Sequence, residues 1–347
     1  MKVSEELLRK LAQLAQTDRT VLSAYLDLRK GWDAAKDFID RESERLLPLL
    51  DSQERDYFKT SLSFMFGCIN EKRAEKFRGS GVAFFAALGA DFTSCVGLTA
   101  APEPFLAVDN EAIIHPLALE LDEYEPIGVI MIDAHCTRIL TVAGRTMEDM
   151  DAFCRKIHHL SKAGGWSQMR YQRRRAKQIK HFAKEIIEKA IAIFDEAGIR
   201  RIVIAGRNRM ITALEQVFPK QWRDKVIATV PWDLDAADKE FLGKIRPILE
   251  ETERNQEKDL LEKLVTELRR GGLAVAGVEP TRTALTMAQV DTLFVSKGID
   301  FKTAEELTSL AEATAAYVEF VPQENEILVK LGGVAALLRF GLGHKIQ

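Results

Sequence analysis

One segment of the chain combines residue types that could catalyse hydrolysis. Two adjacent glycines, Gly164 and Gly165, are followed by Gln168 and then by a cationic run. Glycine allows positive φ and close approach by a partner, and a glutamine amide can orient water although it is a poor base. Hydrolysis of an activated ester needs a positioned water and donors for the oxyanion. On these residues alone, Gln168 is either such a water-orienting group or a surface glutamine at a helix start.

The cationic run follows helical spacing. Six residues recur at intervals that a helix gathers in one stripe: Arg170, Arg173, Arg174, Lys177, His181 and Lys184. The opposite side is apolar and would pack on a core: Ile179, Phe182, Ala183, Ile186, Ala190 and Ile193. No Asp or Glu occurs between residues 152 and 184. The pattern fits a helix that meets phosphates, and equally a solvated basic helix after a glycine turn.

The remaining elements must position this segment, and 347 residues are enough for two or three domains. We expect an N-terminal α/β domain over residues 1–124. Its first part, to residue 76, reads as mostly helical. Short apolar runs predict strands, at 21–28, 82–88, 93–98 and 105–108.

Residues 125–238 predict a second α/β domain that carries the Gly-Gly segment. Two apolar runs form a predicted hairpin, at 128–133 and 138–143. The Gly-Gly segment and the basic helix follow, and then strands at 201–206 and 226–230 with a helix at 210–217. Strands alternating with helices indicate a sheet covered by helices.

Residues 239–347 predict a third, smaller α/β domain. A long charged helix, continuous or broken near Pro247, is expected over 235–270. Strands are expected at 273–277, 292–296, 317–321 and 326–329, and helices at 304–313 and 334–338. The predicted fold class is therefore α/β, with three mixed α/β domains.

Composition excludes several classes of function. The formal net charge is −3, so any attraction to nucleic acid must come from a local surface. Four cysteines show no ligand spacing and predict neither a zinc site nor a disulfide framework: Cys68, Cys95, Cys136 and Cys154. The chain shows no signal peptide and no apolar run of transmembrane length. We expect a cytoplasmic protein with no membrane partner, cofactor or metal.

Asp133 and His135 form a second candidate for chemistry. They could act as an acid–base pair or as metal ligands, but they lie in the predicted turn between the two hairpin strands. Such turns collect polar residues without catalytic function, and no second carboxylate cluster completes a metal site. We read them as turn residues.

The stretch from Gly164 to Arg175, with the basic helix behind it, resembles the catalytic loop region of archaeal and eukaryotic peptide-chain release factors. There a Gly-Gly-Gln loop precedes a basic helix of the middle domain. The Gly-Gly-x-x-Gln form is similar to that of bacterial relatives and of the eukaryotic peptidyl-tRNA hydrolase of ribosome quality control. Trp166 stands where the strict pattern has glutamine. The stretches at 128–143, 202–206, 226–232, 277–295 and 332–339 also resemble the family, whereas the N-terminal domain does not.

The resemblance implies a middle domain that reaches the peptidyl-transferase centre and hydrolyses the ester between nascent peptide and tRNA. Gly164 and Gly165 would shape the loop, Gln168 would orient water, and the third domain would be a docking module. The implied partners are the large ribosomal subunit, peptidyl-tRNA and rRNA. Seven cations are expected to contact RNA: Lys162, Arg170, Arg173, Arg174, Arg175, Lys177 and Lys180.

The N-terminal domain shows no stop-codon-reading motif, so we expect codon-independent, metal-independent rescue of stalled peptidyl-tRNA. Two alternatives remain. One is a non-enzymatic ribosome-binding factor of the same fold, for a stalling response or dormancy. The weaker one is an RNA nuclease that uses Asp133 and His135.

Overall fold

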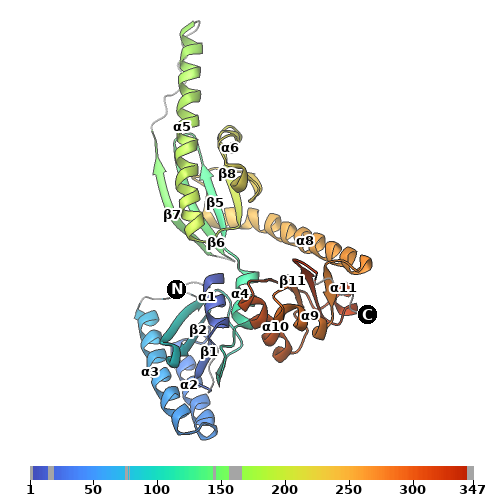
Figure 1. Cartoon of the computed structure of the whole chain (residues 1–347). Coiled ribbons are helices and arrows are strands. Elements are labelled where there is room, and N and C mark those ends of the chain that lie inside the picture. Colours follow the sequence, from blue (N-terminus) through green and yellow to red (C-terminus); the bar gives the residue numbers. More distant parts are fainter. Residues whose placement is uncertain are drawn as a thin grey trace. The chain divides into compact units, whose positions relative to one another are not determined.

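The computed structural model describes residues 3–14, 19–74, 77, 79–143, 146–155 and 166–341, without the side chains of 74, 146, 148 and 166–172. The chain forms two compact units, Met1–Tyr124 with Glu257–Gln347, and Glu125–Gln256. Helices and three sheets confirm the predicted mixed α/β fold class (Figure 1). The division into three domains at residues 124 and 238 stays a prediction. Within the described ranges, no helix has the length and apolar character needed to span a membrane.

The first sheet, in the N-terminal part of the first unit, is antiparallel with strand order β3-β2-β1-β4. Its strands are β1 (Val21–Asp27), β2 (Gly81–Ala87), β3 (Phe92–Leu98) and β4 (Phe105–Asp109). The helices of this part are α1 (Glu5–Ala12), α2 (Trp32–Leu46), α3 (Ser52–Ala74) and α4 (His115–Glu123), with short 3₁₀ turns η1 (Leu47–Leu49) and η2 (Leu88–Ala90). Side chains alternate along β1, so one face packs on α2 and α3 and the other on α1 and α4.

The second sheet, in the C-terminal part of the same unit, has strand order β10-β13-β11-β12. Only β11 and β12 pair in parallel. Its strands are β10 (Ala274–Ala276), β11 (Val290–Ser296), β12 (Tyr317–Val321) and β13 (Val334–Leu338). The helices are α9 (Val278–Thr286), α10 (Phe301–Ala313) and α11 (Glu326–Lys330).

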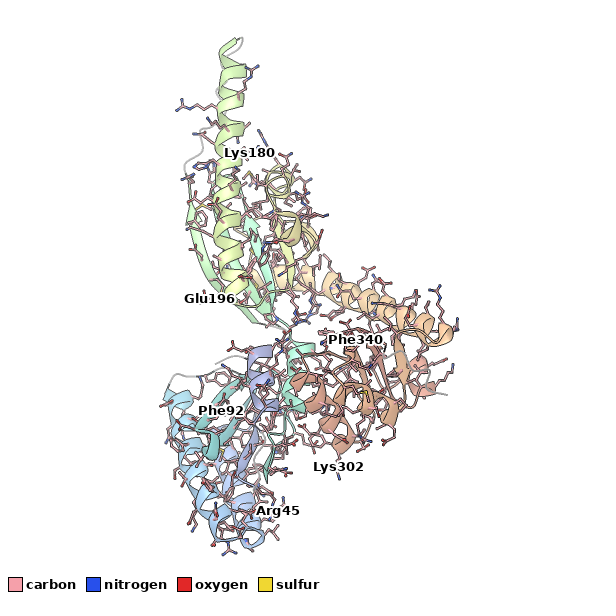
Figure 2. The ribbon with its side chains drawn as sticks, in the orientation of Figure 1. Arg45, Phe92, Lys180, Glu196, Lys302 and Phe340 are labelled. Carbon is pink, nitrogen blue, oxygen red and sulfur yellow. A yellow bond between two sulfur atoms is a disulfide. The ribbon has the colours of Figure 1, made fainter. Side chains whose placement is uncertain are left out.

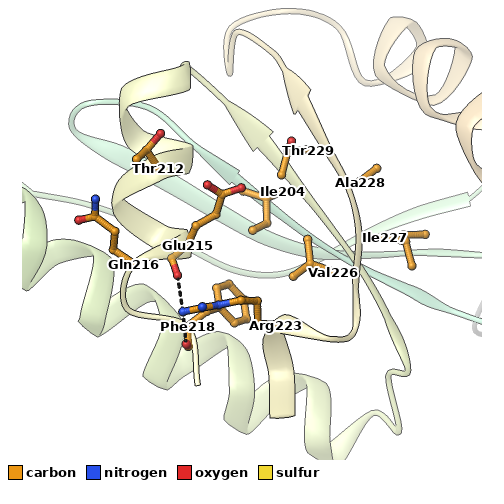
Figure 3. Close-up of a pocket in the computed structure, with 10 residues that line it drawn as sticks. All are labelled: Ile204, Thr212, Glu215, Gln216, Phe218, Arg223, Val226, Ile227, Ala228 and Thr229. Carbon is orange, nitrogen blue, oxygen red and sulfur yellow. Dashed lines mark hydrogen bonds between the residues drawn. The ribbon is translucent and has the colours of Figure 1, made fainter. Parts of the chain in front are cut away.

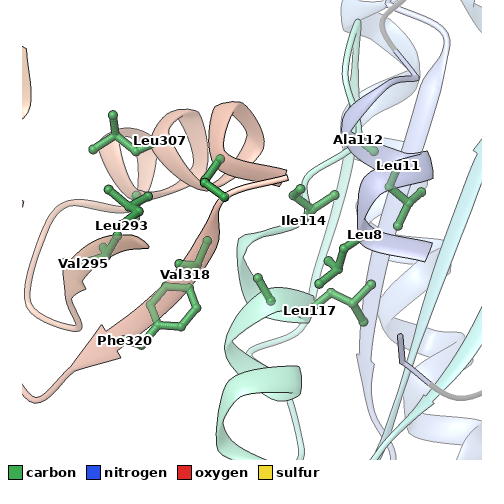
Figure 4. Packing of buried hydrophobic residues seen from close by; sticks show 14 of the residues in the cluster. Leu8, Leu11, Ala112, Ile114, Leu117, Leu293, Val295, Leu307, Val318 and Phe320 are labelled. Carbon is green, nitrogen blue, oxygen red and sulfur yellow. The ribbon is translucent and has the colours of Figure 1, made fainter. Parts of the chain in front are cut away.

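The N-terminal and C-terminal parts of this unit share one apolar core (Figure 4). Leu8 and Leu117 belong to the same buried cluster as Leu293 and Phe320. Beside this cluster, the Glu305 carboxylate on α10 accepts hydrogen bonds from the N–H groups of Ile114 (2.8 Å) and His115 (2.7 Å) at the start of α4. The junction is therefore held by apolar packing and by a carboxylate at a helix N-terminus.

The third sheet forms the second unit, with strand order β7-β6-β5-β8-β9. Strands β7, β6 and β5 pair in antiparallel fashion, whereas β5, β8 and β9 are parallel. The strands are β5 (Ile127–Ile132), β6 (Cys136–Ala143), β7 (Thr146–Cys154), β8 (Arg201–Gly206) and β9 (Val226–Pro231). The helices are α5 (Trp166–Glu196), α6 (Asn208–Glu215), α7 (Lys220–Arg223) and the first part of α8 (Asp238–Arg270). Helix α8 is unbroken at Pro247, and its residues from Glu257 on belong to the first unit.

Strand β5 shows how the residues of this unit produce its three layers. Its alternate residues Ile130 and Ile132 join the cluster of α5 and α6, whereas Val129 and Met131 join the cluster that includes Phe241 of α8. Gly128 allows α5 to approach the sheet, because a Cβ there would lie 2.7 Å from the ring of Phe194. The sheet is thus covered by α5 and α6 on one face and by α8 on the other.

Two predicted elements near the C-terminus were wrong. Residues 326–329 belong to helix α11, because the Asn325 side chain caps it by accepting from the N–H groups of Ile327 and Leu328. Residues 334–338 form strand β13 instead of a helix, because β13 lies between β10 and β11 and pairs with both. Strand β7 was not predicted at all.

The absence of disulfides was also a wrong prediction. Cys68 is bonded to Cys95, with a Cα–Cα distance of 6.5 Å, and Cys136 is bonded to Cys154, with a Cα–Cα distance of 4.0 Å. The partners are 27 and 18 residues apart in the sequence, so only the pairing of the elements brings them together.

Candidate catalytic loop and nucleic-acid interface

Helix α5 begins at Trp166, so Gln168 is the third residue of the helix and lies in its first turn. The predicted loop residues Lys162, Gly164 and Gly165 lie outside the described residues, as do the side chains of Gln168 and Arg170. The 31 residues of α5 span about 46 Å. Its first turns extend past the strands of its own sheet (Figure 1).

The core-facing side of α5 is the one that the spacing predicted. Five of the six predicted residues are buried, and Ile193 is half-buried against the same cluster. Ile187 and Phe194 complete this face. Ile179, the first buried residue among the described side chains of α5, follows Gln168 by eleven residues. Gln168 thus lies about 16 Å along the helix axis from the part that is anchored in the core.

The outward side of α5 is cationic and solvent-facing. Five basic side chains are exposed, and Figure 2 marks one of them, Lys180: Arg173, Arg174, Lys177, Lys180 and Lys184. Within the part of the chain that the structure describes, none of the five forms an ion pair. A hollow of about 540 Å³ lies along this face, lined by Arg174, Lys177, Gln178, Lys180, His181 and Lys184. Such a surface can bind phosphates without first breaking contacts within the protein.

Arg175 differs from the exposed cations. It is half-buried, and its Nε atom is enclosed without a hydrogen-bond partner among the described atoms. An enclosed Nε atom is poorly placed to meet a polyanion directly. Among the five predicted RNA contacts whose side chains the structure describes, Arg175 is therefore the one that the geometry favours least.

Strand β7 and the following Arg155 lead into residues 156–165 and are fastened to α5 by several side-chain contacts. The ring of Phe153 packs edge-to-face on Phe182, at 5.9 Å between centroids. Lys189 Nζ lies 3.8 Å from the Phe153 ring centroid and 3.3 Å from Asp151 Oδ2. Arg155 pairs with Glu185 at 3.1 Å. Both chain segments that flank residues 156–165 thus belong to one packed framework, which the polar sequence of β7 did not reveal.

Asp133 has a structural role in the turn between β5 and β6. Its Oδ1 atom accepts hydrogen bonds from the N–H groups of His135 and Cys136, both at 2.6 Å. This is the way in which an aspartate stabilises a tight turn. In the described ranges, no group of three or more His, Cys, Asp or Glu side chains could hold a metal ion.

Other cations of this unit are bound within it. Arg138 on β6 pairs with Asp149 at 3.0 Å and with Asp238 at 2.8 Å, which fastens the start of α8. Hydrogen bonds from Arg138 lower the pKa of Asp238. At the start of β8, Arg201 pairs with Glu125 and Glu253, both at 2.9 Å. These cations stabilise the fold, in contrast to the five exposed cations from Arg173 to Lys184 on α5.

A second hollow, of about 630 Å³, lies between α6 and β9 (Figure 3). Strand β9 is at the edge of its sheet. Arg223 donates to the carbonyl oxygens of Glu215 (2.9 Å) and Phe218 (3.1 Å), so its charge serves the local turn. Among the described lining residues, Glu215 is the only carboxylate. None of the predicted site residues lies here.

Two family models match adjoining parts of the chain. Residues 113–257 match bacterial archaeo-eukaryotic release factor family 10. Residues 255–342 match eRF1 domain 3. The first match contains strand β7, helix α5 and the segment between them.

Individual relatives agree with these models. The chain is 25% identical over 289 residues to peptide chain release factor subunit 1 of Archaeoglobus fulgidus, which covers 67% of this chain and 70% of that one. It is 28% identical over 167 residues to a pelota homolog of Methanocaldococcus jannaschii, which covers 45% of this chain and 48% of that one. For several other archaeal release factor subunits, the match spans about half of the relative's length.

Among solved structures, Dom34 of S. cerevisiae, a translation termination-like factor, aligns over 99% of this chain and 93% of its own, at 10% identity and a TM-score of 0.45. The family models and the archaeal relatives confirm the resemblance noted in the sequence. The chain is a relative of the archaeo-eukaryotic release factor family.

Proposed function

We propose that this protein hydrolyses the peptidyl-tRNA ester on stalled ribosomes or large subunits, without reading a codon. One observation carries the proposal: α5 places Gln168 in its first turn, directly after the Gly-Gly segment, on a helix whose outer face presents unpaired cations among the described residues. The matched release factor family and the names of the archaeal relatives support a role in translation.

The chemistry would be attack of water on the ester carbonyl carbon. Gln168 would orient the water through its amide, which accepts one hydrogen bond and donates others. The Gly-Gly segment lets backbone N–H groups approach the carbonyl oxygen as it becomes an oxyanion. The products are a peptide with a free carboxylate and a tRNA with its 3′ hydroxyl restored. Loss of one such orienting or donating group typically costs about 10²–10³-fold in rate.

The cations of α5 would bind phosphates of rRNA or tRNA. Arg173, Arg174, Lys177 and Lys180 are exposed, and Lys162 and Arg170 belong to the same acid-free stretch of sequence. Each phosphate contact should contribute about 1 to the dependence of log K on log salt concentration. We infer that α5 would both bind the protein to RNA and bring the Gly-Gly segment to the peptidyl-tRNA ester.

The domain assignment belongs to the same proposal. Residues 125–238 would be the catalytic domain, and residues 239–347 would be a docking module. The match of residues 255–342 to eRF1 domain 3 supports a separate role for the C-terminal part. Residues 1–124 lie mostly outside the family matches, which begin at residue 113.

A non-enzymatic ribosome-binding factor is the second candidate. Trp166 occupies the position of the glutamine in the strict Gly-Gly-Gln pattern, and it is the first residue of α5. This places Gln168 inside the helix instead of before it, and a helical glutamine has less freedom to follow a substrate. The RNA nuclease receives no such support, because Asp133 is engaged with the N–H groups of its turn.

The decisive experiment uses stalled ribosome complexes and isolated large subunits that carry labelled peptidyl-tRNA. Wild-type protein is compared with Gln168→Ala and with the matched control Gln172→Ala, which removes the same side chain one helical turn further on. Peptide release and tRNA length are followed on gels, and binding is followed by sedimentation. We expect free peptide and intact tRNA with wild type and Gln172→Ala, and at least about a hundredfold slower release with Gln168→Ala.

Other outcomes would reject the hydrolase. Co-sedimentation without release in all three samples would establish the binding factor. Shortened tRNA that disappears with Asp133→Ala would establish the nuclease. Equal losses in Gln168→Ala and Gln172→Ala would show that Gln168 has no special role.

A further inference from the structure

The disulfide between Cys136 and Cys154 lies at the end of β7, just before residues 156–165 in the sequence. Cys136 is the first residue of β6 and Cys154 is the last residue of β7. The two face each other directly in the antiparallel register, with a Cα–Cα distance of 4.0 Å. Gly164 follows Cys154 by ten residues in the sequence. The bond therefore fixes the strand end from which the candidate catalytic loop begins.

The antiparallel pairing of β6 with β7 runs to the end of β7, where Thr137 faces Phe153 and Cys136 faces Cys154. The N–H of Arg155 donates to the carbonyl oxygen of His135 at 2.6 Å. Beyond that bond, side-chain packing of Phe153 and the ion pair of Arg155 hold β7 to α5. The disulfide adds a covalent restraint at the last residues of β7, and its loss would leave the strand pairing and these side-chain contacts, which can open by fraying at the strand end.

The same disulfide can be reached from solvent. Cys154 is exposed and Cys136 is half-buried. The other disulfide, Cys68–Cys95, joins α3 to β3, and both of its cysteines are half-buried against an apolar cluster. A thiol can approach an exposed sulfur more easily than one packed on a core. The chain thus contains an accessible disulfide next to the candidate loop, and a more protected one in the N-terminal part of the first unit.

We propose that Cys136 and Cys154 form a reversible thiol–disulfide switch that sets how firmly the start of the candidate loop is held. The regulatory consequence rests on the proposed hydrolase function. In the oxidised state the end of β7 is fixed to β6 and release is fast. In the reduced state the strand end opens more often and release slows.

The switching reaction needs a dithiol as reductant, either a small molecule or a dithiol protein. One thiolate attacks Sγ of Cys154, which forms a mixed disulfide and expels Cys136 as a thiolate that then takes up a proton. The second thiol of the reductant attacks the mixed disulfide, which frees Cys154 and leaves the reductant as a disulfide. Two electrons and two protons pass to the protein. Oxidation by a disulfide of the same class reverses both steps.

The test uses the full chain in dithiothreitol buffers of defined ratio of reduced to oxidised form. Wild type is compared with Cys136→Ser/Cys154→Ser and with the matched control Cys68→Ser/Cys95→Ser. Differential alkylation with mass spectrometry reports each disulfide, and hydrogen exchange reports the opening of peptides from β6 and β7. Peptide release from stalled complexes is measured in the same samples.

We expect the Cys136–Cys154 bond to be reduced first, while the protein stays folded. Exchange in peptides near residues 133–155 should then rise by about tenfold, and release should slow by about three- to tenfold. The Cys136→Ser/Cys154→Ser variant should match reduced wild type in every buffer. The control should respond to the buffers as wild type does. If the serine variant does not fold, the comparison of oxidised and reduced wild type still shows whether reduction of the Cys136–Cys154 bond raises exchange and slows release.

Three results would overturn the switch. The bond could stay intact until the protein unfolds, exchange could stay the same after its reduction, or release could be active yet equal in both states. If neither state releases peptide, the proposed hydrolase fails, and alkylation and exchange alone then judge the switch.

Discussion

Two helix N-termini in this chain meet negative charge in different ways. At the start of α4, the Glu305 carboxylate accepts from the N–H groups of Ile114 and His115, so the protein itself supplies the anion. At the start of α5, the first turn contains no acidic residue, and the sequence is free of Asp and Glu from residue 152 to 184. The same backbone dipole thus stabilises an internal junction in one place and favours an external anion in the other.

The side chains near these helices differ in the same way. Around α4 and α10, several charged groups are half-buried or paired: Glu305 is half-buried, and Lys297 pairs with Glu123. Along α5, the five exposed cations described above, from Arg173 to Lys184, have no ion-pair partner among the described residues. Charged residues around α4 and α10 thus stabilise the fold, whereas the exposed cations of α5 are available to a ligand. Substitutions on α5 should therefore weaken binding, and substitutions at the α4–α10 junction should lower stability.

The largest effect is expected from charge reversal on α5. The triple variant Arg173→Glu, Arg174→Glu and Lys177→Glu should bind large subunits at least about a hundredfold more weakly near 0.1 M salt, and the salt slope should fall by about 3. These side chains are exposed, so the fold should persist. Binding is measured by sedimentation over a series of KCl concentrations.

The matched control for this reversal is a triple on α8: Lys258→Glu, Lys263→Glu and Arg270→Glu. It makes the same change in net charge at exposed positions. Affinity should stay within about threefold of wild type, since removal of nonspecific surface charge has small effects in salt. Equal losses for both triples would mean that overall charge, and not the α5 surface, governs binding.

The next largest effect is expected at the α4–α10 junction. Glu305→Ala leaves two backbone N–H groups at the start of α4 without their acceptor, which should cost about 1–3 kcal/mol of unfolding free energy at pH 7.5. Ribosome binding should not change. Urea unfolding, followed by hydrogen exchange on peptides of the first unit, measures the loss.

Glu306→Ala is the neighbouring control. Glu306 is exposed and pairs with Arg282 on the outside of α10, so its loss should destabilise the unit less than Glu305→Ala does. A Glu305→Ala protein as stable as wild type would show that the carboxylate does not hold the junction.

A pH dependence should follow from the same junction. Burial, reinforced by the charge of Glu319, raises the pKa of Asp122 to about 8, and burial raises the pKa of Glu305 to about 7. The folded state then binds protons more tightly than the unfolded state, so this stability is present below about pH 4 and is lost as the pH rises toward 8. Asp122→Asn should flatten the decline between pH 5.5 and 8. A decline of unchanged slope in this variant would exclude Asp122 as its source.

The smallest effect is expected for a half-buried surface cation that already has partners. Arg282 pairs with Glu279 and Glu306 on the surface. Arg282→Ala should change neither ribosome binding nor the unfolding midpoint beyond the error of the measurement. A clear loss of binding would mean that a cation paired within the fold also contacts the ribosome, and that the binding surface is not confined to α5.

The sequence predicted α5 well because its 3.6-residue period is strong over many turns. Every residue assigned to the apolar face, from Ile179 to Ile193, packs on the core as expected. Strand β13 was misread because Ala and Leu favour helices, while pairing on both sides made it a strand. Helix α11 is too short to show a period, and its signal was the cap residue Asn325.

The framework of the candidate site was less visible in the sequence. Strand β7 carries Glu148, Asp149 and Asp151, so no apolar alternation marks it. Cysteine spacing could not reveal the disulfides, because four cysteines allow three pairings and only strand register selects one. The sequence therefore indicated the candidate catalytic and RNA-binding residues. The contacts of the neighbouring strand β7, including its disulfide to β6, depend on strand pairing, which the sequence did not reveal.

The shared core of the first unit has a consequence for synthesis of the chain. Leu8 and Leu117 are made early, but their partners Leu293 and Phe320 follow only after the whole second unit. The second unit can fold as it emerges, since its 132 residues are continuous. The first unit must close a loop longer than 100 residues, which raises its contact order and slows its folding. A nascent chain that stops before β11 would expose the apolar faces of α1 and α4, which makes it a substrate for chaperones and proteases.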